Sequence, residues 1–67
     1  MNQSPKYLIS LLEAYGFIFK RAKGSHQVYY NAIKNSTVIV PVHGGKDIKK
    51  GTFLAILKQA GIDKNEL

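Results

Sequence analysis

The sequence predicts a small α+β domain in which a three-stranded antiparallel sheet carries two helices on one face. Apolar residues recur at helical spacing near both ends of the chain, and β-branched and aromatic residues fill three segments between them. The 67 residues are 45% hydrophobic, so the chain can form one core but is too short for a second domain. We therefore expect a single domain over residues 1–67, with both helices packed on the same side of the sheet.

The first helix is predicted from its capping residues and its apolar stripe. Ser4 is a good N-cap, and Pro5 occupies the first helical position, where a missing N–H costs nothing. Gly16 provides the left-handed residue that closes the helix. The apolar stripe consists of Tyr7, Leu8, Leu11, Leu12 and Tyr15.

Three strands are expected over residues 17–22, 26–31 and 37–42. Lys23 and Gly24 are expected to form the first turn, and residues 32–35 the second. In the second strand, alternation places His26, Val28 and Tyr30 on one face and Gln27 and Tyr29 on the other. Pro41 marks a sheet edge or a strand end. Among the aromatic residues, we expect Tyr7, Tyr15, Phe17 and Phe19 in the core.

The second helix follows a loop over residues 43–47. Its core stripe is predicted to contain Phe53, Leu54, Ile56 and Leu57, and Gly61 closes it. Asp63 is placed to cap a last short turn.

Composition excludes several classes of protein. Ten basic and four acidic residues give a net charge of +6, which favours a polyanionic partner but is also common in soluble proteins. Without cysteine there can be no disulfide, thiolate nucleophile or cysteine zinc site. We expect no metal ion and no other cofactor, no membrane association and no signal peptide, and we therefore expect a cytoplasmic location.

Few residues suggest chemistry when each is considered alone. His26 follows Gly24 and Ser25 and is the best general acid–base candidate, although an isolated histidine is more often structural. His43 could contact phosphate or hold its loop, and we expect a structural role for it. Lys49 and Lys50 fall at the start of the second helix, where cations are unfavourable for the helix but favourable for phosphate; a solvated basic loop explains them equally well.

Taken together, these segments resemble the HicA toxin family. The resemblance is carried, in order and over nearly the whole chain, by Gly24-Ser25-His26, Val28-Tyr29, Val40-Pro41-Val42-His43, Lys49-Lys50-Gly51-Thr52, Leu54, Ile56, Leu57 and Gln59-Ala60-Gly61-Ile62. It implies a fold like that of double-stranded-RNA-binding domains and an mRNA-cleaving toxin of a type II toxin–antitoxin pair. It also implies that His26 is catalytic and that a HicB-like antitoxin is the protein partner.

The resulting hypothesis is a metal-independent endoribonuclease with His26 as general acid or base. The RNA-binding residues are expected to be Gly24, Ser25, Arg21, Lys23, Lys49 and Lys50. One histidine cannot act as acid and base at once, and the second group, water or a tyrosine, stays open. The main alternative is a non-catalytic double-stranded RNA-binding module, which leaves the Gly24-Ser25-His26 motif unexplained. A third hypothesis is a subunit that only binds other proteins, but such a subunit would not require the excess of basic residues.

Overall fold

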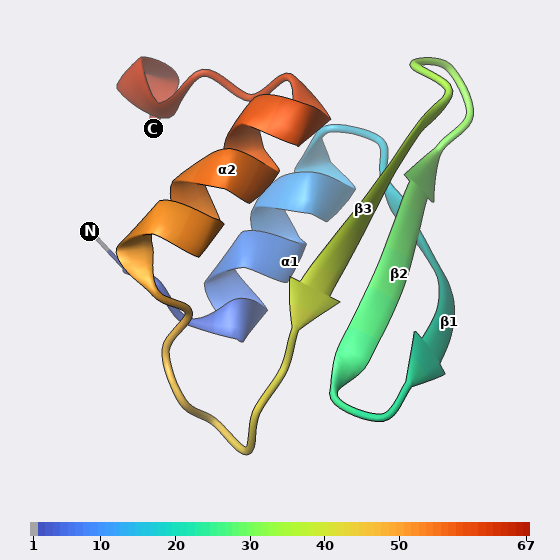
Figure 1. The fold of residues 1–67 in the computed structure, drawn as a ribbon. Coiled ribbons are helices and arrows are strands. Elements are labelled where there is room, and N and C mark those ends of the chain that lie inside the picture. Colours follow the sequence, from blue (N-terminus) through green and yellow to red (C-terminus); the bar gives the residue numbers. More distant parts are fainter. Residues whose placement is uncertain (1) are drawn as a thin grey trace.

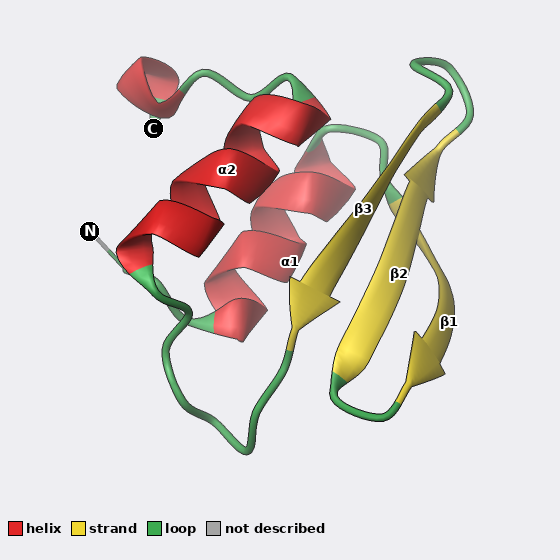
Figure 2. Ribbon diagram, viewed as in Figure 1, coloured by secondary structure: helices red, strands yellow, loops and turns green. Residues whose placement is uncertain are grey.

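The computed structural model describes residues 2–67 and confirms the predicted order of elements. Figure 2 shows the helices and strands in separate colours. The elements are α1 (Pro5–Ala14), β1 (Ile18–Lys23), β2 (His26–Asn31), β3 (Ser36–Pro41), α2 (Lys50–Ala60) and a short 3₁₀ turn, Lys64–Glu66.

The three strands form one antiparallel sheet in the order β1-β2-β3. Both helices lie on the same side of this sheet (Figure 1), so its other face is left without a helical cover. β3 is an edge strand that ends at Pro41, as the proline predicted. The helices pack chiefly against β3, whereas every residue of β1 is exposed.

The helix ends agree with the predicted signals, with one informative exception. The Ser4 side chain accepts a hydrogen bond of 3.1 Å from the Tyr7 N–H, and Pro5 begins α1. The glycines that follow the two helices, Gly16 and Gly61, have φ of +93° and +74°. By contrast, Lys49 is the N-cap of α2, and no side-chain hydrogen bond caps that helix.

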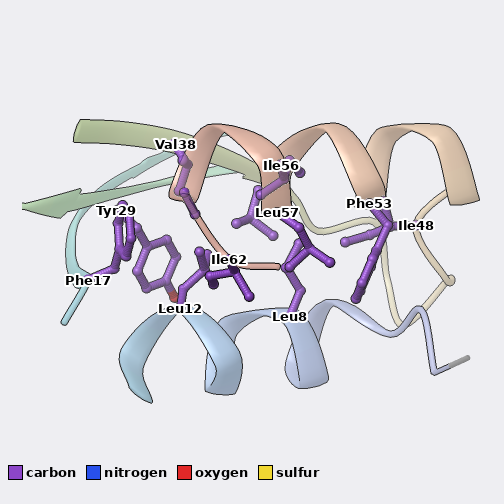
Figure 3. Packing of buried hydrophobic residues seen from close by; sticks show 12 residues of the cluster. Leu8, Leu12, Phe17, Tyr29, Val38, Ile48, Phe53, Ile56, Leu57 and Ile62 are labelled. Atoms are coloured by element: carbon purple, nitrogen blue, oxygen red, sulfur yellow. The ribbon is translucent and has the colours of Figure 1, made fainter. Parts of the chain in front are cut away.

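The hydrophobic core lies between the two helices and the covered face of the sheet (Figure 3). Phe17 is part of this core, as predicted. The predicted core residues Tyr7 and Tyr15 are half-buried and pack against it. The prediction for Phe19 is wrong, because this side chain is 51% exposed. Phe19 lies on the poorly covered strand β1, beside a β-bulge, and touches the core through an edge-on contact with Tyr29 at 5.7 Å.

Strand pairing refines the predicted boundaries. The first turn consists of Gly24 and Ser25, not Lys23 and Gly24, because Lys23 already pairs with His26. β3 begins and ends one residue earlier than expected, and its last residue, Pro41, pairs with His26. His26 therefore lies at the end of the sheet, between a partner on β1 and a partner on β3.

Asn31 is a buried polar residue that connects α1 to the turn between β2 and β3. Its side chain is 2% exposed. The Asn31 Nδ2 donates to the Tyr15 carbonyl at 2.9 Å, and its Oδ1 accepts from the Lys34 N–H at 3.0 Å. Both ends of the amide are thus satisfied inside the protein.

Candidate functional site

His26 occupies an exposed position at one end of the sheet. It is the first residue of β2 and follows the two-residue turn of Gly24 and Ser25. Gly24 has a φ of +58°, a conformation that side chains of L residues rarely adopt, so glycine makes this tight hairpin possible. The turn therefore presents the His26 imidazole to solvent rather than to the core.

The fold brings His43 next to His26, although seventeen positions separate them in the sequence. The two ring centroids are 6.4 Å apart, and the ring planes are inclined by 75°. His43 follows β3 on an exposed stretch of chain, and β3 runs antiparallel to β2. The segment that follows β3, including His43 two residues after Pro41, is thus delivered to the end of the sheet at which β2 begins.

A surface hollow of about 610 Å³ lies beside the two histidines. Its polar lining consists of His26, His43, Lys46, Asp47, Lys49 and Thr52. Its apolar lining consists of Ile39, Pro41 and Ile48. The hollow combines two groups that can exchange protons near neutral pH with two ammonium groups and one carboxylate, a composition suited to an anionic ligand.

Backbone hydrogen bonds hold the loop that carries most of this lining. The Val42 N–H donates to the Ser25 carbonyl at 2.6 Å, which ties the residue before His43 to the residue before His26. At the other end of the loop, the Ile48 N–H donates to the Gln3 carbonyl at 2.8 Å, and Gln3 Nε2 donates back to the Ile48 carbonyl at 2.7 Å. In Figure 1 this loop, yellow to orange, lies at the same end of the molecule as the turn between β1 and β2.

The start of α2 adds positive potential to the hollow. Lys49, the N-cap of this helix, and Thr52, in its first turn, line the hollow, and the N–H groups of that turn have no side-chain cap. The N-terminal end of a helix carries a partial positive charge and free N–H donors, which together favour an anion such as phosphate.

The structure gathers some of the predicted site residues and separates others. His26 and Lys49 line the hollow, and Gly24 and Ser25 form the adjoining turn. Lys23 pairs with His26 across the strands, so the two side chains share a face of the sheet. Arg21, which pairs with Val28, and Lys50, the first residue of α2, are exposed but do not line the hollow, and neither does Lys23.

Sequence reasoning missed Lys46, Asp47, Thr52 and Ile39 as lining residues, and it treated His43 as structural. Lys46, Asp47 and Thr52 lie next to the predicted Lys49 and Lys50 in the sequence, whereas the proximity of Ile39 and His43 to His26 depends on the strand register. A signal for His43 was nevertheless present: once the hairpin of β2 and β3 is closed, Pro41 falls opposite His26 and His43 comes two residues later.

Residues 2–67 contain neither a cluster of metal-ligating side chains nor a membrane-spanning helix. In this part of the chain, no three His, Cys, Asp or Glu side chains come together as a metal site. No helix formed by these residues has the length and apolar character needed to span a membrane.

Comparison with known proteins gives one family match. The model of a family described as the HicA toxin of bacterial toxin–antitoxin systems matches residues 5–62. A search of curated proteins found no match to the chain. The family match includes every element from α1 to the end of α2, and with them both histidines.

Proposed function

The chain belongs to the HicA toxin family, and on this basis we propose that it is an endoribonuclease that cleaves mRNA as the toxin of a type II toxin–antitoxin pair. The observation that carries the proposal is the position of His26. It lies exposed at the end of the sheet, in a hollow that also contains Lys49 and the start of α2. A proton-exchanging group is thereby placed beside a phosphate-binding environment.

The proposed reaction is attack of an RNA 2′-oxygen on the adjacent phosphorus. His26 takes the proton from the 2′-hydroxyl or gives one to the departing 5′-oxygen. Negative charge that develops on the phosphate is stabilised by Lys49 and by the N–H groups of the first turn of α2.

Further contacts to RNA come from residues around the hollow. Lys23 shares a face of the sheet with His26, and Arg21 lies earlier on the same strand. Gly24 and Ser25 allow the sugar–phosphate chain to approach the backbone of the turn closely. Lys50 extends the positive surface beyond the hollow.

We propose that cleavage needs no metal ion. The donor set argues for this, since the sequence has no cysteine, two histidines and four acidic residues, and Asp47 is the one carboxylate that lines the hollow. Two histidines and one carboxylate that also face two lysines form a poor site for a divalent ion.

A cleavage assay on purified protein tests both proposals. Wild type should cut RNA equally well with and without excess EDTA, and His26→Ala should lose about 10²–10⁴-fold in rate. Because His26 is exposed, this substitution should cost about 1 kcal/mol or less, compared with about 2–5 kcal/mol for a core truncation. Near wild-type cleavage by His26→Ala, or loss of its activity through unfolding, would show that the assignment is wrong.

The alternative function, a non-catalytic module that binds double-stranded RNA, rests on the α-β-β-β-α order and the basic charge. It predicts binding without cleavage, so the same assay decides between the two. The alternative gives no role to the hollow that joins the two histidines.

Family membership also implies an antitoxin partner. We propose a HicB-like protein that covers the His26 end of β2 with an acidic surface in the cytoplasm, since opposite charges accelerate association with a toxin of charge +6. Amide hydrogen exchange of β2 should slow in the complex. Unchanged exchange there, with toxicity unrelieved by co-expression of the partner, would refute this assignment.

A further inference from the structure

We propose that His43 is a second catalytic residue, paired with His26 as the other acid–base group of the same cleavage reaction. This inference rests on the proposed ribonuclease function. It supplies the participant that a single histidine leaves missing, because transfer of a phosphoryl group from the 5′-oxygen to the 2′-oxygen requires one proton to be removed and another to be delivered.

The geometry of the two rings fits this division of roles. The centroids are 6.4 Å apart, and the planes are inclined by 75°, so the rings neither stack nor lie in contact face to face. Among residues 2–67, neither imidazole has a hydrogen-bond partner, and both side chains are exposed. A phosphate held by hydrogen bonds of about 2.6–3.2 Å can therefore meet a nitrogen of each ring.

The position of His43 is fixed by the same hydrogen bonds that shape the hollow. The Val42 N–H to Ser25 carbonyl bond of 2.6 Å joins the two residues that directly precede His43 and His26. On the other side, the His43 carbonyl accepts from the Lys46 N–H at 2.9 Å, which closes a turn through Gly44 and Gly45. His43 is thus held between two backbone contacts while its side chain is left open to a ligand.

The lining of the hollow argues against a tyrosine as the second acid–base group. None of the four tyrosines lines it. Tyr29 donates its hydroxyl to Gln27 Oε1 at 2.9 Å on the covered face of the sheet, and Tyr30 donates to Asn35 Oδ1 at 3.1 Å at the far end of β2. A tyrosine is therefore not placed to serve, whereas His43 is.

The reaction balances with these two groups alone. One histidine is neutral at the start and takes the 2′-hydroxyl proton while the 2′-oxygen forms its bond to phosphorus. The other is protonated and gives its proton to the 5′-oxygen while the bond from phosphorus to that oxygen breaks. The products are a 2′,3′-cyclic phosphate and a 5′-hydroxyl, and the two histidines have exchanged protonation states.

Charged groups of both signs surround the pair. Lys46 and Lys49 face the hollow from the loop and from the start of α2, and Lys23 pairs with His26 from β1. Asp47 is the carboxylate that faces the same space. The reaction needs one neutral and one protonated ring at the same time. The cleavage rate should therefore pass through a maximum as the pH is varied.

The experiment uses the full chain and a short RNA with one cleavage site, made with either oxygen or sulfur at the 5′-bridging position. Single-turnover rates at saturating RNA are measured for wild type, His26→Ala, His43→Ala and His43→Asn. On the oxygen substrate, each His43 variant should lose about 10²–10⁴-fold in rate, with its melting temperature and RNA affinity retained. Ile33→Ala is the matched control, since Ile33 is exposed in the turn at the opposite end of β2.

The sulfur substrate distinguishes the acid from the base. A thiolate leaves without being protonated, so a variant that lacks the acid should recover most of the wild-type rate, whereas a variant that lacks the base should not. Recovery by a variant at one histidine and not at the other is the expected result. The cleavage rate of wild type should also show a bell-shaped dependence on pH, and each variant should lose one limb of that curve.

Three results would overturn the pairing. Near wild-type rates for both His43 variants, with His26→Ala inactive, would leave the proposed ribonuclease standing and remove His43 from the reaction. Loss of RNA affinity with a normal rate at saturation would make His43 a binding residue only. If neither the His26 variant nor the His43 variants recover on the sulfur substrate, both histidines are excluded as the acid. If wild type cuts no RNA, the proposed function itself fails, and this is distinguishable from the other outcomes.

Discussion

Lys49→Ser should make the protein more stable and a weaker binder of RNA. Lys49 has φ −58° and ψ 141°, close to the φ −68° and ψ 146° of Ser4, whose hydroxyl caps α1. The backbone at Lys49 is therefore shaped for a serine cap but carries a lysine. By analogy with Ser4 and Tyr7, the new hydroxyl would accept from the Thr52 N–H.

The magnitude follows from two separate effects on α2. An N-cap hydrogen bond contributes about 0.5–2 kcal/mol, with about 1 kcal/mol typical. Removal of a cation from the positive end of the helix dipole contributes about 0.3–1 kcal/mol more. We therefore expect the free energy of unfolding to increase by about 1–2 kcal/mol. In a domain of this size, each kcal/mol raises the melting temperature by about 4–8 °C.

The expected loss of RNA affinity is measured on the same Lys49→Ser variant. If Lys49 contacts one phosphate, its loss should flatten the slope of log K against log salt by about 0.7 for single-stranded RNA. Lys64→Ser is the matched control, because it removes the same charge from the exposed 3₁₀ turn and leaves the start of α2 unchanged. Thermal melts and RNA titrations at several salt concentrations give both quantities.

Either half of the expectation can fail separately. A variant that melts at or below the wild-type temperature would show that the capping argument is wrong. A variant with unchanged RNA affinity and salt slope would show that Lys49 belongs to a solvated basic loop. Higher stability with weaker binding is the pattern expected where a residue is kept for function against the local preference of the helix.

Two further predictions concern buried polar groups of the fold. Burial, and then the nearby Glu13 carboxylate, raise the pKa of Tyr29 above 10.0. The folded state therefore holds this proton more tightly, so its stabilisation is complete below about pH 10 and is lost as pH rises through the raised pKa. Urea midpoints of wild type should fall relative to Tyr29→Phe above that pH, and parallel curves would contradict this. Asn31→Leu should cost about 1–3 kcal/mol, because it leaves the Tyr15 carbonyl and the Lys34 N–H without their partners; an unchanged melting temperature would refute it.

Elements with local signals could be predicted from the sequence. Ser4 and Pro5 specify the start of α1 through hydrogen-bonding and φ preferences that act within one turn, and the structure has both in those roles. Asp63 likewise caps the 3₁₀ turn by accepting from the Asn65 N–H at 2.9 Å. Phe19 was mispredicted because aromatic character reports the tendency to form a strand, whereas burial depends on which strand the helices cover.

The local sequence indicates His26 but not the strand pairing that brings His43 beside it. His26 was found from the local motif Gly24-Ser25-His26, but His43 was not, because its distance from His26 is set by the register of β2 against β3. That register follows from the four-residue turn, which places Asn31 opposite Ser36 and Pro41 opposite His26. A shift of one residue would turn Val38 and Val40 away from the core, so burial of these two valines also fixes where β3 delivers His43. The packing that stabilises the sheet thus brings the two imidazoles together, and a sequence argument that had first closed this hairpin would have found the pair.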